Sequence, residues 1–355
     1  MYKLSFLLLV IIIVLLSFQN HKTATEQPVA LGAYYFNGWR PDSTHITQYL
    51  VDSFPEREPI WGWVTNTQEI MDAQINEAAN AGLTFFSFCW YYNKRKPLEE
   101  SNPIIKVYLN SPNRERLKYC LMVANHPHNE IGPNDWNKVT TEWIKLFKGD
   151  SYMTVDGKPL LIFFEVSSLI ERFNSAEHVK EAFDLLRKKA QKEGLKGVVI
   201  AVCASPSTKG IAKAEACGFD IITAYNYPSV GFNEGESRQT PIDSLIVSEK
   251  RIWDRVAQLS KLPYVPASTL NWDARPWADS AEYHTKRYYT GFSSNSVYKS
   301  TKSLTAWIKE NKEQTTKDPI GLLYAWNEYG EGAWLTPSKN SEDNLLDGVK
   351  KALTE

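Results

Sequence analysis

The sequence lacks an excess of either charge. Its 40 lysines and arginines and 41 aspartates and glutamates leave a formal net charge of −1, with the two signs mixed along the chain. Because proteins that bind nucleic acid carry a basic patch or stripe, no nucleic acid is expected among the partners. The sequence also has no internal repeat, no low-complexity tract and no Pro/Gly/Ser-rich linker. A single large domain is therefore expected.

Cysteine is scarce. The chain has four, Cys89, Cys120, Cys203 and Cys217, and their spacing does not match pairs of metal ligands. Three of them lie in apolar, strand-like runs, which favours buried small hydrophobic residues. A disulfide between Cys89 and Cys120, on neighbouring strands, stays open for an exported protein.

A long hydrophobic run stands at the N-terminus. Residues 1–18 read MYKLSFLLLVIIIVLLSF, with one lysine ahead of about fifteen apolar residues. This pattern predicts a signal peptide over residues 1–24, with Ala24 as the candidate cleavage site. The run is short for a membrane span, which needs roughly 20 apolar residues, so an uncleaved anchor is the alternative. No cysteine follows for a lipoprotein anchor, and we expect a secreted or periplasmic monomer with its domain over residues 25–355.

Eight short runs are apolar on both faces, as strands of a buried parallel sheet are. They cover residues 29–36, 83–92, 118–124, 160–166, 197–204, 219–226, 264–272 and 320–328.

Amphipathic helical patterns separate the runs. In TQEIMDAQINEAANAG, Ile70, Ala73, Ile75, Ala78 and Ala79 gather toward one face, and Gly82 supplies the stop. SAEHVKEAFDLLRKKAQKEG has Ser175 as a predicted N-cap and Gly194 past its end. Eight strands, each followed by a helix, predict a (β/α)₈ TIM barrel. The alternative is an open doubly wound sheet, but no glycine-rich phosphate loop follows the first run.

On a barrel, chemistry belongs at the C-terminal ends of the strands and in the loops that follow. Those positions hold aromatic rings, amides and a few carboxylates, which suit the C–H face and hydroxyl edge of a sugar. The alternative is that the rings only cap the barrel core. On the sugar interpretation, the expected substrate-binding residues are Tyr34, Tyr35, Trp90, Tyr91, Tyr92, Asn125, His126, Glu165, Tyr225, Tyr227, Trp272, Asp273, Arg275, Trp326, Asn327, Tyr329 and Trp334.

Two glutamates, Glu328 and Glu331, follow the last apolar run in AWNEYGEGAWL. Glycoside hydrolysis needs two carboxyl groups, one to protonate the leaving oxygen and one to act as nucleophile or base. Residues three apart on a continuous strand face opposite sides, but Gly330 and Gly332 permit a sharp turn that aims both inward. Held close, the two would have coupled titrations. The alternative is that one is a surface charge in a loop.

Other polar residues compete for roles in the site. Glu165 is either a substrate contact or a hydrogen-bonded supporting group, and Asp273 either reaches a sugar hydroxyl or pairs with Arg275. His126 and His128, with Glu130, suggest a metal site, but no further histidine at a strand end completes the set. We therefore expect no metal and no cofactor, and a loop histidine that contacts substrate.

The motif AWNEYGEGAWLTP resembles the WNEW-x-EG signature of the family 99 endo-α-mannosidases and endo-α-1,2-mannanases and of the related WbsX-like proteins. The stretches WGWVTNTQEIMDAQINEAANAGLTFFSFCWYY, NKRKPLEE, VDGKPLL and NWDARPW are similar to the WbsX-like pattern and follow in the same order. The resemblance spans roughly residues 29–340. It departs at Tyr329-Gly330, where the mannosidases commonly have Trp-His, and this bears on mannose specificity more than on reaction class.

The resemblance implies a retaining glycoside hydrolase without a metal. Glu328 would deprotonate the substrate's own 2-hydroxyl, which attacks C1 to give a 1,2-anhydro sugar, and Glu331 would serve as general acid and then base. The expected function is cleavage of a polysaccharide or glycan, with the loop from Asp273 to about Ser300 forming one wall of the cleft. The alternatives are a WbsX-like glycosyltransferase of polysaccharide assembly and a non-catalytic glycan-binding barrel.

Overall fold

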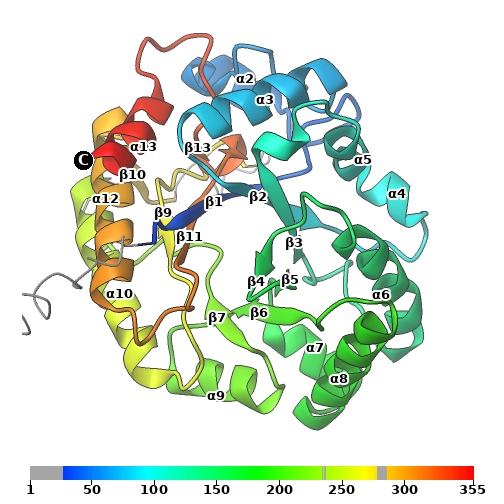
Figure 1. Cartoon of the computed structure of the whole chain (residues 1–355). Coiled ribbons are helices and arrows are strands. Elements are labelled where there is room, and N and C mark those ends of the chain that lie inside the picture. The colour runs from blue at the N-terminus through cyan, green and yellow to red at the C-terminus, as the bar shows by residue number, and fades with distance from the viewer. Residues whose placement is uncertain (1–26, 234, 236, 278–285) are drawn as a thin grey trace, which may run out of the picture.

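The computed structural model describes residues 27–233, 235, 237–277 and 286–355, which form a barrel of parallel strands inside a ring of helices (Figure 1). The hydrophobic N-terminal run and the predicted cleavage site at Ala24 lie outside the described residues, so the predicted signal peptide stays a prediction. Within the described ranges, no helix is long and apolar enough to cross a membrane.

All eight predicted strands are present. Seven lie inside the apolar run that predicted them, and β5 begins two residues before its run at 160–166. They are β1 (Ala30–Tyr35), β2 (Phe85–Trp90), β3 (Lys118–Val123), β5 (Lys158–Phe163), β6 (Val199–Cys203), β7 (Ile221–Thr223), β9 (Ala267–Thr269) and β11 (Ile320–Tyr324).

The strands close into a barrel. Hydrogen-bonded neighbours follow the order β7-β6-β5-β3-β2-β1-β11-β9, and every pair in this series is parallel. A parallel bridge between Ile222 and Tyr264 joins β7 to the segment before β9, where Val265 N donates to Ile222 O over 2.9 Å. The predicted (β/α)₈ barrel is therefore confirmed, and the open doubly wound alternative is wrong.

Helices follow each barrel strand and cover the outside of the sheet (Figure 1). The α-helices are α2 (Gln48–Ser53), α3 (Gln68–Asn80), α4 (Leu98–Ser101), α5 (Pro103–Leu109), α6 (Pro133–Phe147), α7 (Val166–Phe173), α8 (Ala176–Lys192), α9 (Thr208–Ala216), α10 (Ile242–Leu259), α12 (Ser294–Glu310) and α13 (Leu345–Thr354). Short elements outside the barrel are η1 (Pro55–Arg57), η2 (Arg114–Arg116), η3 (Tyr329–Glu331), β4 (Thr154–Val155), β8 (Gln239–Pro241), β10 (Tyr288–Thr290), β12 (Asn327–Glu328) and β13 (Ala333–Trp334).

Helix α3 illustrates how the sequence sets a boundary and where the pattern misleads. Gly82 ends the turn after the helix with φ +95°, as predicted. The predicted apolar face was partly wrong, because Gln74 is fully buried while Ile70 is half-buried. Gln74 lies inward because its Oε1 accepts a hydrogen bond of 2.7 Å from the indole of Trp326, just past β11.

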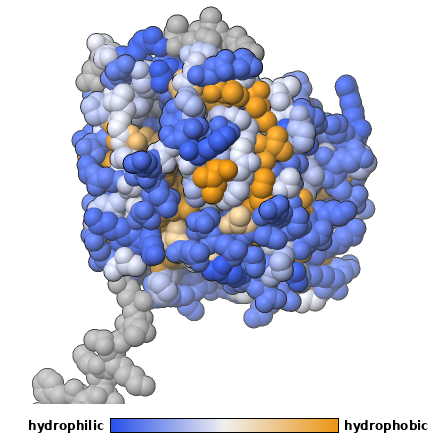
Figure 2. Space-filling model, turned by 90° about the horizontal axis from the view of Figure 1, so that it is seen from above, coloured by the Kyte–Doolittle hydropathy of each residue, from blue (hydrophilic) through white to orange (hydrophobic). Residues whose placement is uncertain are grey.

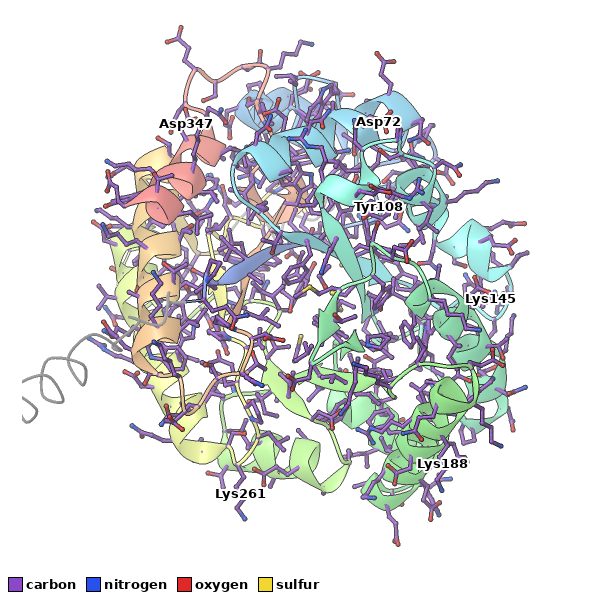
Figure 3. The ribbon with its side chains drawn as sticks, in the orientation of Figure 1. Asp72, Tyr108, Lys145, Lys188, Lys261 and Asp347 are labelled. Atoms are coloured by element: carbon purple, nitrogen blue, oxygen red, sulfur yellow. The ribbon has the colours of Figure 1, made fainter. Side chains whose placement is uncertain are left out.

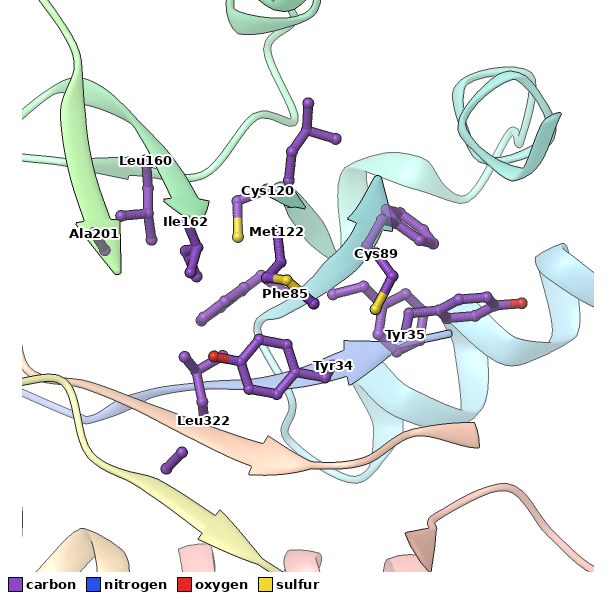
Figure 4. Packing of buried hydrophobic residues seen from close by; sticks show 14 of the residues in the cluster. Tyr34, Tyr35, Phe85, Cys89, Cys120, Met122, Leu160, Ile162, Ala201 and Leu322 are labelled. Atoms are coloured by element: carbon purple, nitrogen blue, oxygen red, sulfur yellow. The ribbon is translucent and has the colours of Figure 1, made fainter. Parts of the chain in front are cut away.

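Side chains from the strands fill the barrel interior (Figure 4). Gly32 of β1 leaves room for the ring of Phe85 from β2, since a Cβ at Gly32 would lie 2.2 Å from that ring. Tyr34 and Tyr35 leave β1 in different directions, because successive side chains of a strand point to opposite faces. Consecutive aromatic residues at a strand end therefore have separate fates.

The four cysteines are free thiols, so the Cys89–Cys120 disulfide that the sequence left open is absent. In the pairing of β2 with β3, Cys120 lies opposite Ser87, and Cys89 lies opposite Met122. Cys89, Cys120 and Cys217 are buried, which confirms their prediction as small hydrophobic residues.

The outer surface is largely polar. Figure 2 shows one face that is mostly hydrophilic, with hydrophobic side chains gathered over part of it. The charged side chains labelled in Figure 3 lie around the outer helices, away from the strands.

Candidate active site

A cleft of about 460 Å³ opens beyond the C-terminal ends of the strands. Side chains at or near the strand ends line it, among them Cys89, Met122 and both Glu328 and Glu331, and side chains from the loops form its outer part. The lining residues are Phe36, Asn37, Gly38, Arg40, His45, Cys89, Tyr91, Asn93, Lys96, Glu100, Ser101, Met122, Ala124, His126, Asn129, Phe164, Tyr225, Trp277, Glu328 and Glu331.

A tight turn over residues 327–334 brings the two glutamates together. β12 and β13 pair antiparallel, with Asn327 opposite Trp334, and η3 lies between them. Gly332 closes the turn with φ +76°, a conformation that side-chain-bearing residues rarely adopt. A Cβ at Gly332 would also lie 2.9 Å from Asp273 Cβ, so the close packing requires glycine.

The side chain of Asn327 fixes this turn to the loop after β1. Its Oδ1 accepts from Phe36 N over 2.7 Å, and its Nδ2 donates to Phe36 O over 3.0 Å. The indole of Trp39 donates to Asn327 O over 2.6 Å. Asn327 was a predicted substrate-binding residue, but these bonds and its complete burial make it a brace instead.

Two tyrosines hold the two carboxyl groups. Tyr225 donates its hydroxyl to Glu328 Oε1 over 2.5 Å, and Tyr324 donates its hydroxyl to Glu331 Oε2. The two rings pack edge to face with centroids 4.9 Å apart. Each glutamate therefore has its own phenol, and packing between the phenols keeps the two carboxyl groups in a fixed relation.

Burial dominates the electrostatics of the pair. It raises the pKa of Glu328 to about 8, against a smaller lowering by the hydrogen bond from Tyr225. It likewise raises the pKa of Glu331 to about 8. No lysine or arginine in the described part of the chain forms an ion pair with either carboxyl. Both groups can thus carry a proton near neutral pH, as a general acid requires.

Aromatic rings form the walls of the cleft. Trp277 stacks on His45 with centroids 4.8 Å apart and an interplanar angle of 13°. Tyr91 and Phe164 both lie against the His126 ring, at 6.0 and 6.1 Å. Flat apolar surfaces beside hydrogen-bonding groups are what a sugar ring needs.

Three of the predicted substrate-binding residues line the cleft with the glutamates: Tyr91, His126 and Tyr225. Each comes from a different strand end. Their apolar surfaces face the same space as the two carboxyl groups.

Seven predicted substrate-binding aromatics lie in the core instead: Tyr34, Tyr35, Trp90, Tyr92, Tyr227, Trp326 and Tyr329. Tyr34 points into the barrel below the cleft, where its hydroxyl donates to Ala224 O over 2.8 Å. Trp90 points outward and packs edge to face on Trp143 of α6. Tyr329 is turned away from the cleft, and its hydroxyl bonds that of Thr336. Their burial fits the alternative weighed for them, rings that cap the core.

Asn125 and Glu165 brace neighbouring loops. Asn125 Oδ1 accepts from Glu165 N over 3.0 Å, and its Nδ2 donates to Glu165 O over 2.6 Å. Neither side chain is part of the cleft lining. Glu165 precedes α7 as its N-cap residue, its side chain makes no capping hydrogen bond, and Asn125 binds its backbone, so both interpretations of the Glu165 carboxyl stay predictions.

Asp273 forms ion pairs with Arg57 and Arg275. This group, called the arginine cluster below, lies outside the cleft lining. Asp273 receives hydrogen bonds of 2.7 Å from Arg275 Nε and of 2.5 Å from Arg57 Nη2. Two other predicted residues, Trp272 and Trp334, also lie outside the cleft lining. Trp334 packs on Phe292 at 4.9 Å. The alternative weighed for Asp273, pairing with Arg275, is therefore the observed one.

Sequence reasoning missed much of the outer cleft. Arg40, His45 and Lys96 come from the loops after β1 and β2, and Trp277 comes from the loop after β9. Trp277 fits the expectation that the loop after Asp273 forms a wall, although residues 278–285 of that loop lie outside the described ranges. The motifs NKRKPLEE and NWDARPW, which contain Lys96 and Trp277, carried the available signal.

Glu130 and His126, which suggested a metal site, have separate partners. Glu130 Oε1 accepts from Arg172 over 2.8 Å, and His126 Nδ1 lies 3.1 Å from Pro127 O. Across residues 27–277 and 286–355, apart from two undescribed positions, no group of three or more His, Cys, Asp or Glu could hold a metal ion.

Comparison with known proteins gives a family and a fold. The model of the family described as "Glycosyltransferase WbsX" matches residues 63–349. No curated protein matches the chain. The chain is similar to the family 99 endo-alpha-mannosidase from Bacteroides thetaiotaomicron in complex with BIS-TRIS-propane, with 15% identity and a TM-score of 0.61 over 92% of this chain and 96% of that chain. A "Glycoside hydrolase-like protein" gives 15% identity and a TM-score of 0.68 over 92% and 94% of the two chains.

At these identities the structural likeness shows the shared barrel fold. The family model covers most of the chain, from before β2 to past the 327–334 turn, and β1 lies outside the match. The protein belongs to the WbsX family, on a barrel similar to that of the family 99 endo-α-mannosidases.

Proposed function

We propose that the protein is a glycoside hydrolase that cleaves a polysaccharide or glycan in the cleft at Glu328 and Glu331. The observation that carries the proposal is the arrangement of two carboxyl groups, both with raised pKa, on one turn inside an aromatic-walled cleft. The fold shared with family 99 endo-α-mannosidases supports it.

The two glutamates have separate tasks in the proposed mechanism. Glu328 takes the proton of the substrate's 2-hydroxyl, whose oxygen then attacks C1 and gives a 1,2-anhydro sugar. Glu331 donates a proton to the leaving oxygen. It then deprotonates the water that attacks C1, while Glu328 returns its proton to O2 as the C1–O2 bond of the anhydro ring breaks. Attack at C1 occurs twice, so the anomeric configuration is retained.

The surroundings of the two groups support this assignment. Glu328 is 4% exposed and accepts a hydrogen bond from Tyr225, which favours its carboxylate form. Glu331 is the more exposed of the two and lies toward the open cleft, where a leaving group can take its proton.

The experiment is release of reducing ends from a panel of bacterial, fungal and host glycans. On the glycan that is cleaved, Glu328→Gln and Glu331→Gln should each reduce kcat/KM by about 10²- to 10⁴-fold. Binding of the intact glycan to Glu331→Gln should remain measurable. The control is Glu181→Gln, an exposed position on α8 far along the chain from the turn.

The same panel decides between the proposal and its rivals. Unchanged hydrolysis by Glu331→Gln would remove this residue from the mechanism. Normal turnover of a substrate whose 2-hydroxyl is blocked would contradict substrate assistance. Binding without hydrolysis by the unaltered protein would point to a non-catalytic glycan-binding barrel. Sugar transfer from a nucleotide donor would point to a glycosyltransferase.

Export is a further proposal. The hydrophobic residues 1–18 support export from the cytoplasm. The proposed polysaccharide substrate would then be bound outside it. N-terminal sequencing of the secreted or periplasmic protein would test cleavage near Ala24.

A further inference from the structure

The outer cleft carries two positive side chains on separate loops. Arg40 lies in the loop after β1, and Lys96 lies in the loop after β2. Both line the cleft that holds Glu328 and Glu331. A neutral sugar is bound by rings, amides and hydroxyls, so it gives no reason for two cations here.

Arg40 has only one weak partner for its charge among the described residues. Its side chain is 27% exposed, and its buried Nε makes no hydrogen bond in the described structure. The same Nε lies 3.5 Å from Oδ1 of Asp42, whose side chain is 71% exposed, and this is its one ion pair there. Such an exposed pair is strongly screened and contributes little. The guanidinium therefore keeps donors for another anion.

The charge of Arg40 also acts inside the cleft. Burial first, and then the positive charge of Arg40, lower the pKa of His45. His45 stacks on Trp277 and lines the cleft wall. A charge that is felt by this imidazole is also felt by a ligand lying against the same wall.

Lys96 differs from its neighbour Lys94. Lys94 Nζ lies 3.3 Å from Asp135 Oδ2, and it is not part of the cleft lining. Lys96 is exposed, lines the cleft, and has no ion pair with any described carboxylate. Its backbone N donates to Asn93 O over 3.2 Å, which fixes the turn that presents it.

The negative groups of the cleft do not cancel these cations. Glu100 is the one exposed acid among the described lining residues, whereas Arg40 and Lys96 are two cations in the same lining. Burial raises the pKa of Glu328 and Glu331 to about 8, so together they carry less negative charge near neutral pH than two exposed carboxylates would. The two cations therefore outnumber the one exposed acid in the outer part of the cleft.

We propose that the cleft takes an acidic glycan, in which a carboxylate or sulfate group on the bound sugar chain lies against Arg40 and Lys96. The inference rests on the proposed glycoside hydrolase function and names its substrate class. The planar guanidinium binds such anionic groups through two parallel hydrogen bonds, and the ammonium adds a point charge.

The experiment measures binding to the inactive Glu331→Gln protein by calorimetry. The probes are oligomers of a uronic acid, the same oligomers after carboxyl reduction, a sulfated oligosaccharide and its desulfated form. One acidic probe should bind at least about tenfold more tightly than its neutral partner, the gain of one charge-assisted hydrogen bond. Which pair shows the difference distinguishes carboxylate from sulfate.

Variants localise the effect. Added to Glu331→Gln, Arg40→Gln and Lys96→Gln should each weaken binding of the acidic probe by about tenfold and leave the neutral probe unchanged. Lys94→Gln is the matched control, with the same loss of charge two residues from Lys96 but outside the cleft, and should change neither. Arg40→Lys retains the charge and should recover part of the affinity, which separates a binding role from a folding defect.

Three results would overturn the inference. These are equal affinity for acidic and neutral partners, no binding to any acidic probe, and a loss of binding in Lys94→Gln as large as in Lys96→Gln. Hydrolysis of a neutral glycan alongside any of them would leave the proposed function standing. Tighter binding of a nucleoside diphosphate than of the acidic oligomers, with transfer of its sugar, would overturn both.

Discussion

Two acidic sites follow the paired strands β9 and β11, and their pKa shifts have opposite directions. Asp273 follows β9, and Glu328 and Glu331 follow β11. At Glu328 and Glu331 no described cation is in contact, and burial raises both pKa values to about 8. At Asp273, burial alone would raise the pKa, but hydrogen bonds from Arg275 and the charge of Arg57 lower it overall. Acids at neighbouring strand ends can therefore have opposite pKa shifts. The nearby cations decide which shift results.

The two sites are also mechanically joined. Asp273 N donates to Glu331 O over 2.7 Å, and Arg57 Nη1 donates to Tyr329 O over 2.8 Å. The arginine cluster therefore holds the turn that presents the two glutamates. Its ion pairs stabilise the backbone of the turn. Glu328 and Glu331 have no ion pair among the described residues that would lower their pKa values.

The largest expected effect separates chemistry from stability. Glu328→Gln should lower kcat/KM by about 10²- to 10⁴-fold while the free energy of unfolding is kept, because glutamine removes the base but keeps the size and the oxygen that accepts from Tyr225. Hydrolysis rates and urea unfolding of the same sample measure this. A loss of several kcal/mol in the free energy of unfolding would show that Glu328 has a structural role, like Asp273 in the arginine cluster.

The second prediction is the converse at the arginine cluster. Arg57→Met leaves Asp273 buried with one partner fewer and removes the bond to Tyr329 O, so unfolding should cost about 3 to 5 kcal/mol less. Urea unfolding measures it, with Lys94→Met as a control at an exposed ion pair. If stability is unchanged, the cluster does not support the turn.

The third prediction concerns Glu249, whose pKa is raised although its side chain does not line the cleft. Glu249 is fully buried in α10, accepts from Ser268 Oγ over 2.9 Å and from Thr269 N over 2.6 Å, and burial raises its pKa to about 8. Its folded pKa lies above its unfolded value of 4.5, so its contribution is complete below pH 4.5 and is lost as the pH rises through about 8. Each tenfold difference in proton affinity is worth about 1.4 kcal/mol.

Glu249→Gln should therefore lose stability less steeply than the unaltered protein between pH 5 and pH 8, by about 3 kcal/mol across that range. Urea unfolding at several pH values gives the two slopes. At each pH, the variant and the unaltered protein should hydrolyse the glycan at the same rate. Parallel slopes would mean that Glu249 is ionised in the folded protein. This variant shows whether a raised pKa without a cleft has any catalytic consequence.

The smallest effect concerns the hydrogen bond between Tyr225 and Glu328. Tyr225→Phe removes a donor that favours the carboxylate, so the pKa of Glu328 should rise further. The acidic limb of kcat/KM should then move to higher pH, with a loss of about tenfold at pH 6 and less at pH 9. Tyr227→Phe is the control, because its hydroxyl pairs with Tyr264 in the core. An unmoved limb would assign the base role elsewhere.

The barrel itself could be predicted from the sequence because its strands are buried on both faces. Runs such as residues 83–92 and 320–328 have no polar side to confuse their period, and each contains its strand. The short pair β8 and β10 escaped prediction, since three-residue strands outside the core leave almost no pattern. The glutamate turn could be predicted because Gly332 marks the bend within the motif itself.

The lining of the cleft could be predicted only in part, because neighbouring side chains at a strand end diverge. Cys89 faces the cleft and Trp90 faces α6, yet the tryptophan looks the better sugar platform in the sequence. The positions of Arg40 and Trp277 depend on how two loops fold back over the barrel. Neither has a periodic pattern that fixes its path.

The bonds from Asn327 to Phe36 join residues that are 291 positions apart. During synthesis the chain emerges N-terminal end first, so the loop after β1 waits for nearly the whole domain to be made before it meets its partner. Until residues 320–334 leave the ribosome, β1 has one open edge and the two glutamates do not yet exist. A stalled ribosome would therefore hold a nearly complete barrel that lacks the proposed pair of carboxyl groups, and the cleft is completed only with the last strand.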